Sequence, residues 1–171
     1  MAFDAFLKID GIPGESADKV HKDEIDLVAF SWGETNTGQA TAGGGGAGRS
    51  VAQDFHFVHH VDKATPLLFF ACASGQHIKT AILTCRKAGS TTTTGAAAAA
   101  PAKPGEFLVI KMTDVIITSF TEAGASADDR PQDSVSLNFV QMEVDYTPQS
   151  PTGVNGTTIA RAWNFRANKK I

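Results

Sequence analysis

Two long β-rich stretches decide the fold, FLVIKMTDVIITSF at residues 107–120 and VSLNFVQMEVDY at residues 135–146. Valine, isoleucine, phenylalanine, threonine and tyrosine favour strands, and in both stretches they outnumber the strong helix formers. The segment between the two stretches, residues 121–133, has the polar composition of a loop. The sequence therefore predicts two long β-strands at the centre of the fold.

Shorter stretches of the same kind lie on either side of this pair. They cover residues 3–9, 25–32, 51–57, 78–87 and 157–165. In a chain of 171 residues, at least seven strands separated by turn signals predict a single barrel or sandwich domain.

One segment departs from the strand pattern. Thr65 and Pro66 fit the N-cap and first position of a helix, and Gly75 fits the residue after its end. The residues between them, LLFFACA at 67–73, are apolar almost all round. Such a helix must be covered on more than one side. The β domain is expected to cover one side, and a second subunit could cover the other.

The second long strand also carries apolar groups on both of its faces. Val135 and Phe139 lie on one parity, whereas Met142 and Val144 lie on the other. A strand with one solvated face alternates cleanly instead. Two explanations stay open: the chain's own helix and loops cover the extra apolar surface, or a partner subunit does.

Composition excludes several classes of protein. The chain has 15 Lys and Arg against 18 Asp and Glu, a net charge of −3, which argues against nucleic-acid binding. The apolar runs are far shorter than the ~20 residues that cross a membrane, and the N-terminus lacks the features of a signal peptide. Cys72 and Cys85 follow no metal-binding spacing, so we expect reduced, mostly buried thiols, with a disulfide as the alternative.

No motif for catalysis, a metal or a cofactor stands in a convincing context. Gly43, Gly45 and Gly48 match the dinucleotide pattern, but a strand and not a helix follows them. A flexible loop or an inter-subunit contact explains these glycines. His56 and His60 on one strand would lie ~13 Å apart, too far to bind one metal unaided. We therefore expect the histidine segment, which includes His59, to be a polar, solvated strand end.

An ordered set of short motifs resembles the Hcp family, the hemolysin-coregulated proteins of type VI secretion. The motifs are FLKIDGIPGES at 6–16, EIDLVAFSWG at 24–33, GGGGAGR at 43–49, DFHF at 54–57, DKATP at 62–66, LTCRKAG at 83–89, VSLNF at 135–139, VDY at 144–146 and AWNFR at 162–166. Each motif is short, but together they follow the family's order along nearly the whole chain.

The resemblance implies a mainly β fold: a small β-barrel of two packed antiparallel sheets with one short flanking helix, over residues 1–171. It also implies a homohexameric ring, stacked into the tube that a contractile sheath expels behind a VgrG spike. Small effector proteins would travel in the channel. The protein would be cytoplasmic before assembly and then secreted without a signal peptide. No cofactor, nucleic acid, membrane insertion or enzymatic activity is implied.

The family's pattern also assigns roles to particular residues. Ser31, in the FSWG motif, would line the channel and contact cargo, although it shares parity with Ile25, Leu27 and Ala29, which are expected to be buried. A β-bulge or the end of the core layer must then intervene. The inter-ring or inter-subunit loop would comprise Gly43, Gly44, Gly45, Gly46, Gly48 and Arg49.

One segment departs from the family's pattern. Relatives usually turn sharply after the strand that ends at Gly89, whereas this chain has a loop insertion there, at about residues 90–105 (Ser90 to Gly105). Longer loops cost little free energy, so we expect the fold to survive.

Two alternatives to a tube protein remain open. One is a secreted effector-like enzyme, which would need additional length, and the other is a monomeric binding barrel, which a packed interior would argue against.

Overall fold

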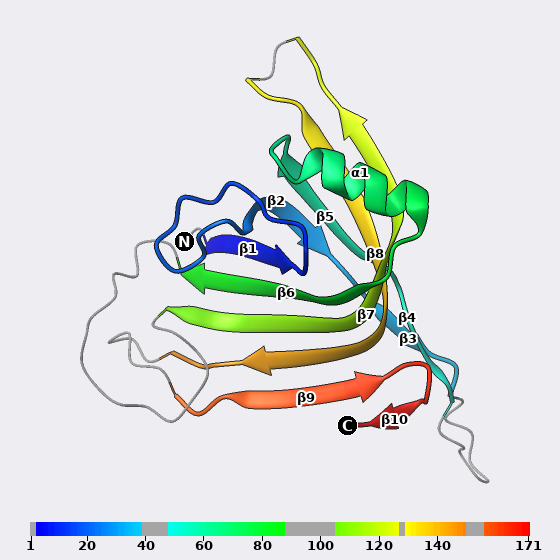
Figure 1. The fold of residues 1–171 in the computed structure, drawn as a ribbon. Helices are drawn as coiled ribbons and strands as arrows, with labels where there is room; N and C mark the ends of the chain where they lie inside the picture. Colours follow the sequence, from blue (N-terminus) through cyan, green and yellow to red (C-terminus); the bar gives the residue numbers. More distant parts are fainter. Residues whose placement is uncertain (1–2, 39–47, 88–104, 127–128, 150–155) are drawn as a thin grey trace, which may run out of the picture.

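The computed structural model describes residues 3–38, 48–87, 105–126, 129–149 and 156–171 (Figure 1). Gly43, Gly44, Gly45 and Gly46 of the expected contact loop lie outside these residues. Nearly all of the 90–105 insertion lies outside them as well, and Gly105 alone is described. No helix within the described ranges is both long and apolar enough to span a membrane.

A closed antiparallel barrel forms the body of the molecule. Its strands are β1 (Phe3–Ile9), β2 (Ile25–Ser31), β5 (Phe55–His60), β6 (Ile78–Lys87), β7 (Glu106–Ala123) and β8 (Gln132–Tyr146). They follow the order β8-β5-β2-β1-β6-β7, and pairing between β7 and β8 closes the ring. The predicted strands and barrel are thus confirmed. The two packed sheets that were expected are opposite sides of one continuous, closed sheet.

Short elements extend the barrel at one end. β9 (Ile159–Asn164) and β10 (Lys169–Lys170) add to the outer edge of β8, outside the closed ring. β3 (Glu34–Asn36) and β4 (Ser50–Ala52) pair only with each other and form a two-stranded arm that continues from β2 and β5 (Figure 1). The segment expected as one strand over 51–57 is therefore divided between the arm and the barrel.

The two long strands bend and serve both sides of the barrel, which explains their apolar pattern. Their register is continuous from Leu108↔Tyr146 to Ile117↔Leu137. Within it the buried parity changes: Met112 and Met142 are buried partners, and so are Val115 and Phe139. Asp114, between the two pairs, has a φ of 55° in the left-handed region. Most of the apolar groups on both parities therefore enter a single core within one chain.

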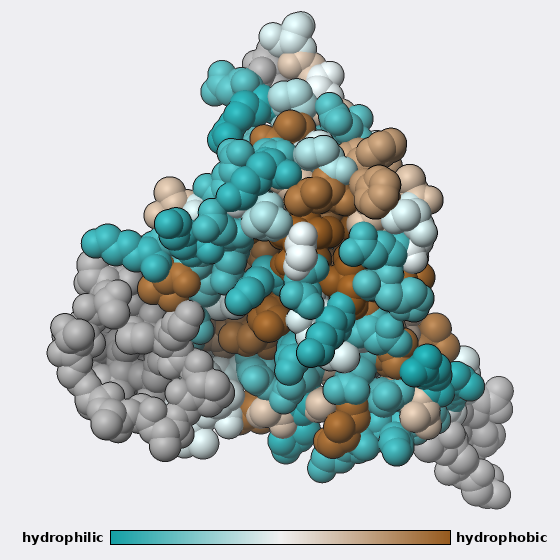
Figure 2. Space-filling view, in the orientation of Figure 1, coloured by the Kyte–Doolittle hydropathy of each residue, from teal (hydrophilic) through white to brown (hydrophobic). Residues whose placement is uncertain are grey.

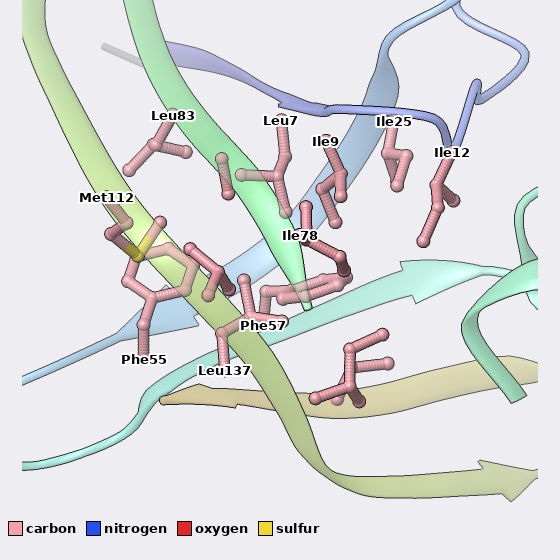
Figure 3. Packing of buried hydrophobic residues seen from close by; sticks show 14 of the residues in the cluster. Leu7, Ile9, Ile12, Ile25, Phe55, Phe57, Ile78, Leu83, Met112 and Leu137 are labelled. Atoms are coloured by element: carbon pink, nitrogen blue, oxygen red, sulfur yellow. The ribbon is translucent and has the colours of Figure 1, made fainter. Parts of the chain in front are cut away.

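Large side chains fill the barrel. Leu7, Phe55, Phe57, Met112 and Leu137 have no exposed surface, and Figure 3 shows them converging from β1, β5, β7 and β8. Full burial of each such side chain stabilises the fold by about 1.5–3 kcal/mol. Because these residues fill the interior, the monomeric binding barrel is not favoured.

The helix α1 (Thr65–Ser74) lies across β7 and β8, with Leu68 and Ala71 buried against the barrel (Figure 1). Gly75 ends it in the left-handed conformation, with φ 63°, as expected. The predicted N-cap is wrong by one residue: Ala64 occupies that position, and the Asp62 carboxylate accepts the Ala64 N–H at 2.8 Å. The Thr65 hydroxyl instead accepts the Asp62 N–H and donates to the Asp133 carboxylate.

The histidine segment is not a uniformly solvated strand end, contrary to expectation. His59 is fully buried on the face that it shares with Phe57. Its Nε2 lies 3.4 Å from the Asp133 carboxylate, which is also fully buried and accepts a hydrogen bond from the Thr65 hydroxyl. The sequence reasoning missed this cluster because Asp133 is distant in sequence and reaches His59 only through β5–β8 pairing.

Candidate functional site

Small polar side chains line the outer face of four adjacent strands. The register pairs Ser31 of β2 with His56 of β5, His56 with Ser136 of β8, and Ser136 with Ser119 of β7. The next row, from β5 onward, runs through Val58, Ser134 and Thr121. We define the polar sheet face as Ser31, His56, Ser119, Thr121, Ser134, Ser136 and Asn138.

A β-bulge places Ser31 on this face. The pairing of β2 with β5 shifts between Leu27 and Ala29, so Leu27 and Phe30 both pack against the core. After the bulge Ser31 is exposed, although simple alternation from Ile25 would bury it. The expected interruption is therefore a bulge, confirmed by the register.

Hydrogen bonds hold the neighbouring polar groups in place. The Ser136 hydroxyl and His56 Nδ1 lie 2.8 Å apart. The Asp54 carboxylate accepts from the Thr118 hydroxyl at 2.5 Å and from the Asn138 amide at 2.8 Å. Among the described residues, the Ser31 side chain makes no hydrogen bond. Ser31 thus presents a free hydroxyl beside a network whose other members already have partners.

The arm brings the second group of expected site residues against the C-terminal hairpin. Arg49 donates from Nη2 to the Arg166 carbonyl at 3.5 Å, and the Ser50 N–H donates to Asn168 Oδ1 at 3.3 Å. Gly48 packs on the facing arm strand, where an added Cβ would lie 2.0 Å from the nitrogen of Gly38. Only glycine fits at position 48 without a local shift. The outer end of the described arm is therefore attached to the C-terminal hairpin of β9 and β10.

A partly buried group of ion pairs around Arg86 involves no residue of the polar sheet face. The Arg86 guanidinium bonds both carboxylate oxygens of Asp18, at 2.6 and 3.2 Å, and lies 3.3 Å from Asp4. The bond to Arg86 holds the pKa of Asp18 well below its usual range. Arg86 also lies over the ring of Phe6, with 5.0 Å to the centroid. These contacts fix the segment that joins β1 to β2.

An apolar groove lies between the barrel and the C-terminal hairpin, and sequence reasoning did not find it. The groove has a volume of about 280 Å³. Its apolar wall consists of Trp32, Met142, Val144, Ala162, Trp163 and Phe165. Glu34, Arg161 and Lys170 complete its lining. These residues come from five separate parts of the fold, so no local sequence pattern could reveal them. We call this feature the β8–β9 groove.

Metal binding gains no support from the positions of the histidines. Within the described ranges, no three His, Cys, Asp or Glu side chains form a group that could hold a metal ion. Cys72 and Cys85 are free cysteines, as the sequence indicates. Burial raises the pKa of the Cys85 thiol to about 11, so this thiol is protonated at neutral pH.

Comparison with known proteins gives consistent results. Residues 6–146 match the family described as "Type VI secretion system effector, Hcp". The chain is 41% identical over 170 residues to the protein hcp1 of Pseudomonas aeruginosa, with 98% of each chain covered. The crystal structure of Hcp1 from Salmonella typhimurium matches at a TM-score of 0.76 and 34% identity over all of both chains. A solved type six secretion system protein matches at a TM-score of 0.86 and 28% identity, over 99% of this chain and 100% of that one.

The fold defines a small closed β-barrel protein with a single flanking helix among the described residues. The family match and the identity to the curated relative cover most of this barrel. The chain belongs to the Hcp family, and it is a structural tube protein of the type VI secretion system. It is accordingly a secreted protein.

Proposed function

We propose that this chain assembles as a homohexameric ring whose polar sheet face forms the channel wall. A wall that small proteins pass along must be wetted and must not bind apolar surface strongly. The polar sheet face meets both needs, because its hydroxyl, amide and imidazole groups cover the strands, and His56, Ser136 and Asn138 are already hydrogen-bonded. This arrangement is the observation that carries the proposal.

Cargo contact is proposed for Ser31. Its hydroxyl is exposed and has no partner within the described residues, so it can donate to or accept from a guest protein. The nearby His56 and Ser136 bond each other and keep the surrounding strands aligned. Ser31 would therefore act as a contact point on a rigid wall and not as a catalytic group.

Ring stacking is proposed for the arm. Gly48 and Arg49 lie at the outer end of its described part, and Gly43 to Gly46 precede them in the sequence. A ring that stacks would form the inner tube within the sheath, topped by a VgrG spike, and would carry small effector proteins. The chain would be cytoplasmic before assembly, leave without a signal peptide, and have no enzymatic activity, cofactor or nucleic-acid partner. Shortening 43–46 should weaken ring stacking and spare the single ring.

The test of this function has two measurements. Light scattering on the purified wild type should give a mass of six chains of 18.0 kDa, and a monomer at high concentration would refute the ring. Ser31→Gln should then keep the ring and reduce the amount of small effector protein that co-purifies with it. Ser126→Gln, an exposed serine in the β7–β8 turn, is the matched control and should retain cargo. Loss of the ring in Ser31→Gln would instead make Ser31 an interface residue.

A further inference from the structure

The exposed side of α1 is almost entirely apolar. Phe69 and Phe70 are 58% and 63% exposed, Leu67 is 41% exposed, and Ala73 is also exposed. The helix has no charged residue at any position. Figure 2 shows the resulting hydrophobic surface at the upper right, where α1 lies in Figure 1. We call these four residues the helix patch.

The β8–β9 groove offers a complementary surface at the other end of the molecule. Its wall is apolar, and its volume of about 280 Å³ suits an inserted aromatic side chain. The indole Nε1 of Trp163 is buried there and has no hydrogen-bond partner among the described residues.

Charges around the two surfaces are of opposite sign. The lining of the groove contains two basic residues, Arg161 and Lys170, and one acidic residue, Glu34. The β7–β8 hairpin, which rises beside α1 in Figure 1, carries exposed Glu122 and Asp129, with Arg130 as its basic residue. The basic groove and the acidic surroundings of the helix patch would attract each other across an interface.

The positions of the surfaces determine the kind of assembly. Figure 1 places α1 at the top of the molecule and β9 and β10 at the bottom, so the two patches do not overlap. Two different patches on one chain make a head-to-tail contact, which closes into a ring when the rotation allows. A symmetric dimer would need one patch that complements itself.

We propose that the helix patch of one copy inserts into the β8–β9 groove of the next copy and forms the lateral contact of the ring. This inference rests on the proposed ring and names its interface. Phe70, the more exposed ring, enters the apolar wall beside Trp163, and Phe69 packs at the rim near Arg161, where a cation–π contact is available. Buried aromatic side chains in pockets carry much of the binding energy of interfaces.

The test uses one variant of each surface. Phe70→Asp disrupts the helix patch and Ala162→Arg fills the groove, and neither residue is fully buried in the single chain. Ile159→Asp is the matched control, because Ile159 is 55% exposed and lies in neither surface. Native mass spectrometry is recorded for each variant and for an equimolar mixture of Phe70→Asp with Ala162→Arg. Circular dichroism checks that each variant is folded.

Each interface variant alone should assemble at least about tenfold more weakly than the wild type, while Ile159→Asp forms rings normally. The mixture should give a dimer of twice 18.0 kDa, because one intact helix patch then meets one intact groove. If folded Phe70→Asp or Ala162→Arg forms rings at the protein concentrations at which the wild type does, the proposed interface is wrong, but the proposal of a ring still stands. A mixture that stays monomeric would also overturn it. A monomeric wild type would refute the ring itself.

Discussion

Removal of the Thr65 hydroxyl should destabilise the attachment of α1 to the barrel. This hydroxyl accepts the Asp62 N–H at 3.2 Å and donates to the fully buried Asp133 carboxylate, which also lies 3.4 Å from His59. A hydrogen bond to a charged group contributes about 1.5–3 kcal/mol. Thr65→Val keeps the shape of the side chain, so the expected loss in the free energy of unfolding is about 2 kcal/mol.

A double-mutant cycle makes this prediction sharper. Asp133→Ala removes the common partner and leaves His59 and Thr65 without it, for an expected loss of about 3–5 kcal/mol. In the double variant Thr65→Val has little left to remove, so the coupling energy should be about 1–2 kcal/mol.

Urea unfolding measures each value. With a slope near 2 kcal/mol per molar, Thr65→Val should lower the midpoint by about 1 M. All variants are compared at one protein concentration, because assembly stabilises the folded chain. Thr121→Val, which removes an exposed hydroxyl, should change the stability by less than about 0.5 kcal/mol. If the stability losses of Thr65→Val and Asp133→Ala sum to that of the double variant within about 0.5 kcal/mol, the coupling through Asp133 is refuted.

Two further predictions concern the arm and the N-terminal segment. Gly48→Ala should destabilise the arm by more than about 1 kcal/mol and so speed tryptic cleavage there about fivefold. Gly33→Ala is the control, because its added Cβ meets only the flexible Gln53 side chain and should not change the cleavage rate. Equal cleavage rates for the two variants would contradict the close approach at Gly48. Asp18→Asn should cost about 1 kcal/mol at neutral pH, unlike the exposed Asp10→Asn. The bond to Arg86 lowers the folded-state pKa of Asp18, so its contribution to stability is present above the unfolded pKa of about 4 and is lost as the pH falls further. A difference in urea midpoint between Asp18→Asn and the wild type that does not change with pH would show that the Asp18 charge does not stabilise the fold.

Periodicity predicted the strands well where the chain runs straight. Phe3–Ile9 alternates and pairs with β6 as a regular strand. It failed where the chain bends or bulges. The shift between Leu27 and Ala29 exposes Ser31, and the bend at Asp114 turns an apparent excess of apolar surface into a single core. A period of two describes only uninterrupted strands, so neither event can be read from parity.

The helix shows how far a local pattern reaches. Its apolar sequence correctly indicated that the barrel alone would not cover it, and Phe69 and Phe70 remain exposed. The residue that attaches its start was not predictable, because Asp133 joins Thr65 across a large separation in sequence. The groove that we propose as its partner could likewise not be predicted, since its lining comes from β3, β8, β9, β10 and the segment after β2.

The order of apolar and turn residues along the chain by itself determined the strands and the helix α1, and the ordered short motifs indicated the family. These features depend on interactions between near neighbours and on motifs that stay together in the sequence. The tertiary structure alone decided which polar groups share the outer face of the sheet, how His59 and Asp133 meet in the interior, and that an apolar groove forms at the opposite end of the molecule from an apolar helix. Each of these is set by strand register and by the bending of β7 and β8, which bring distant residues to positions that no local spacing encodes.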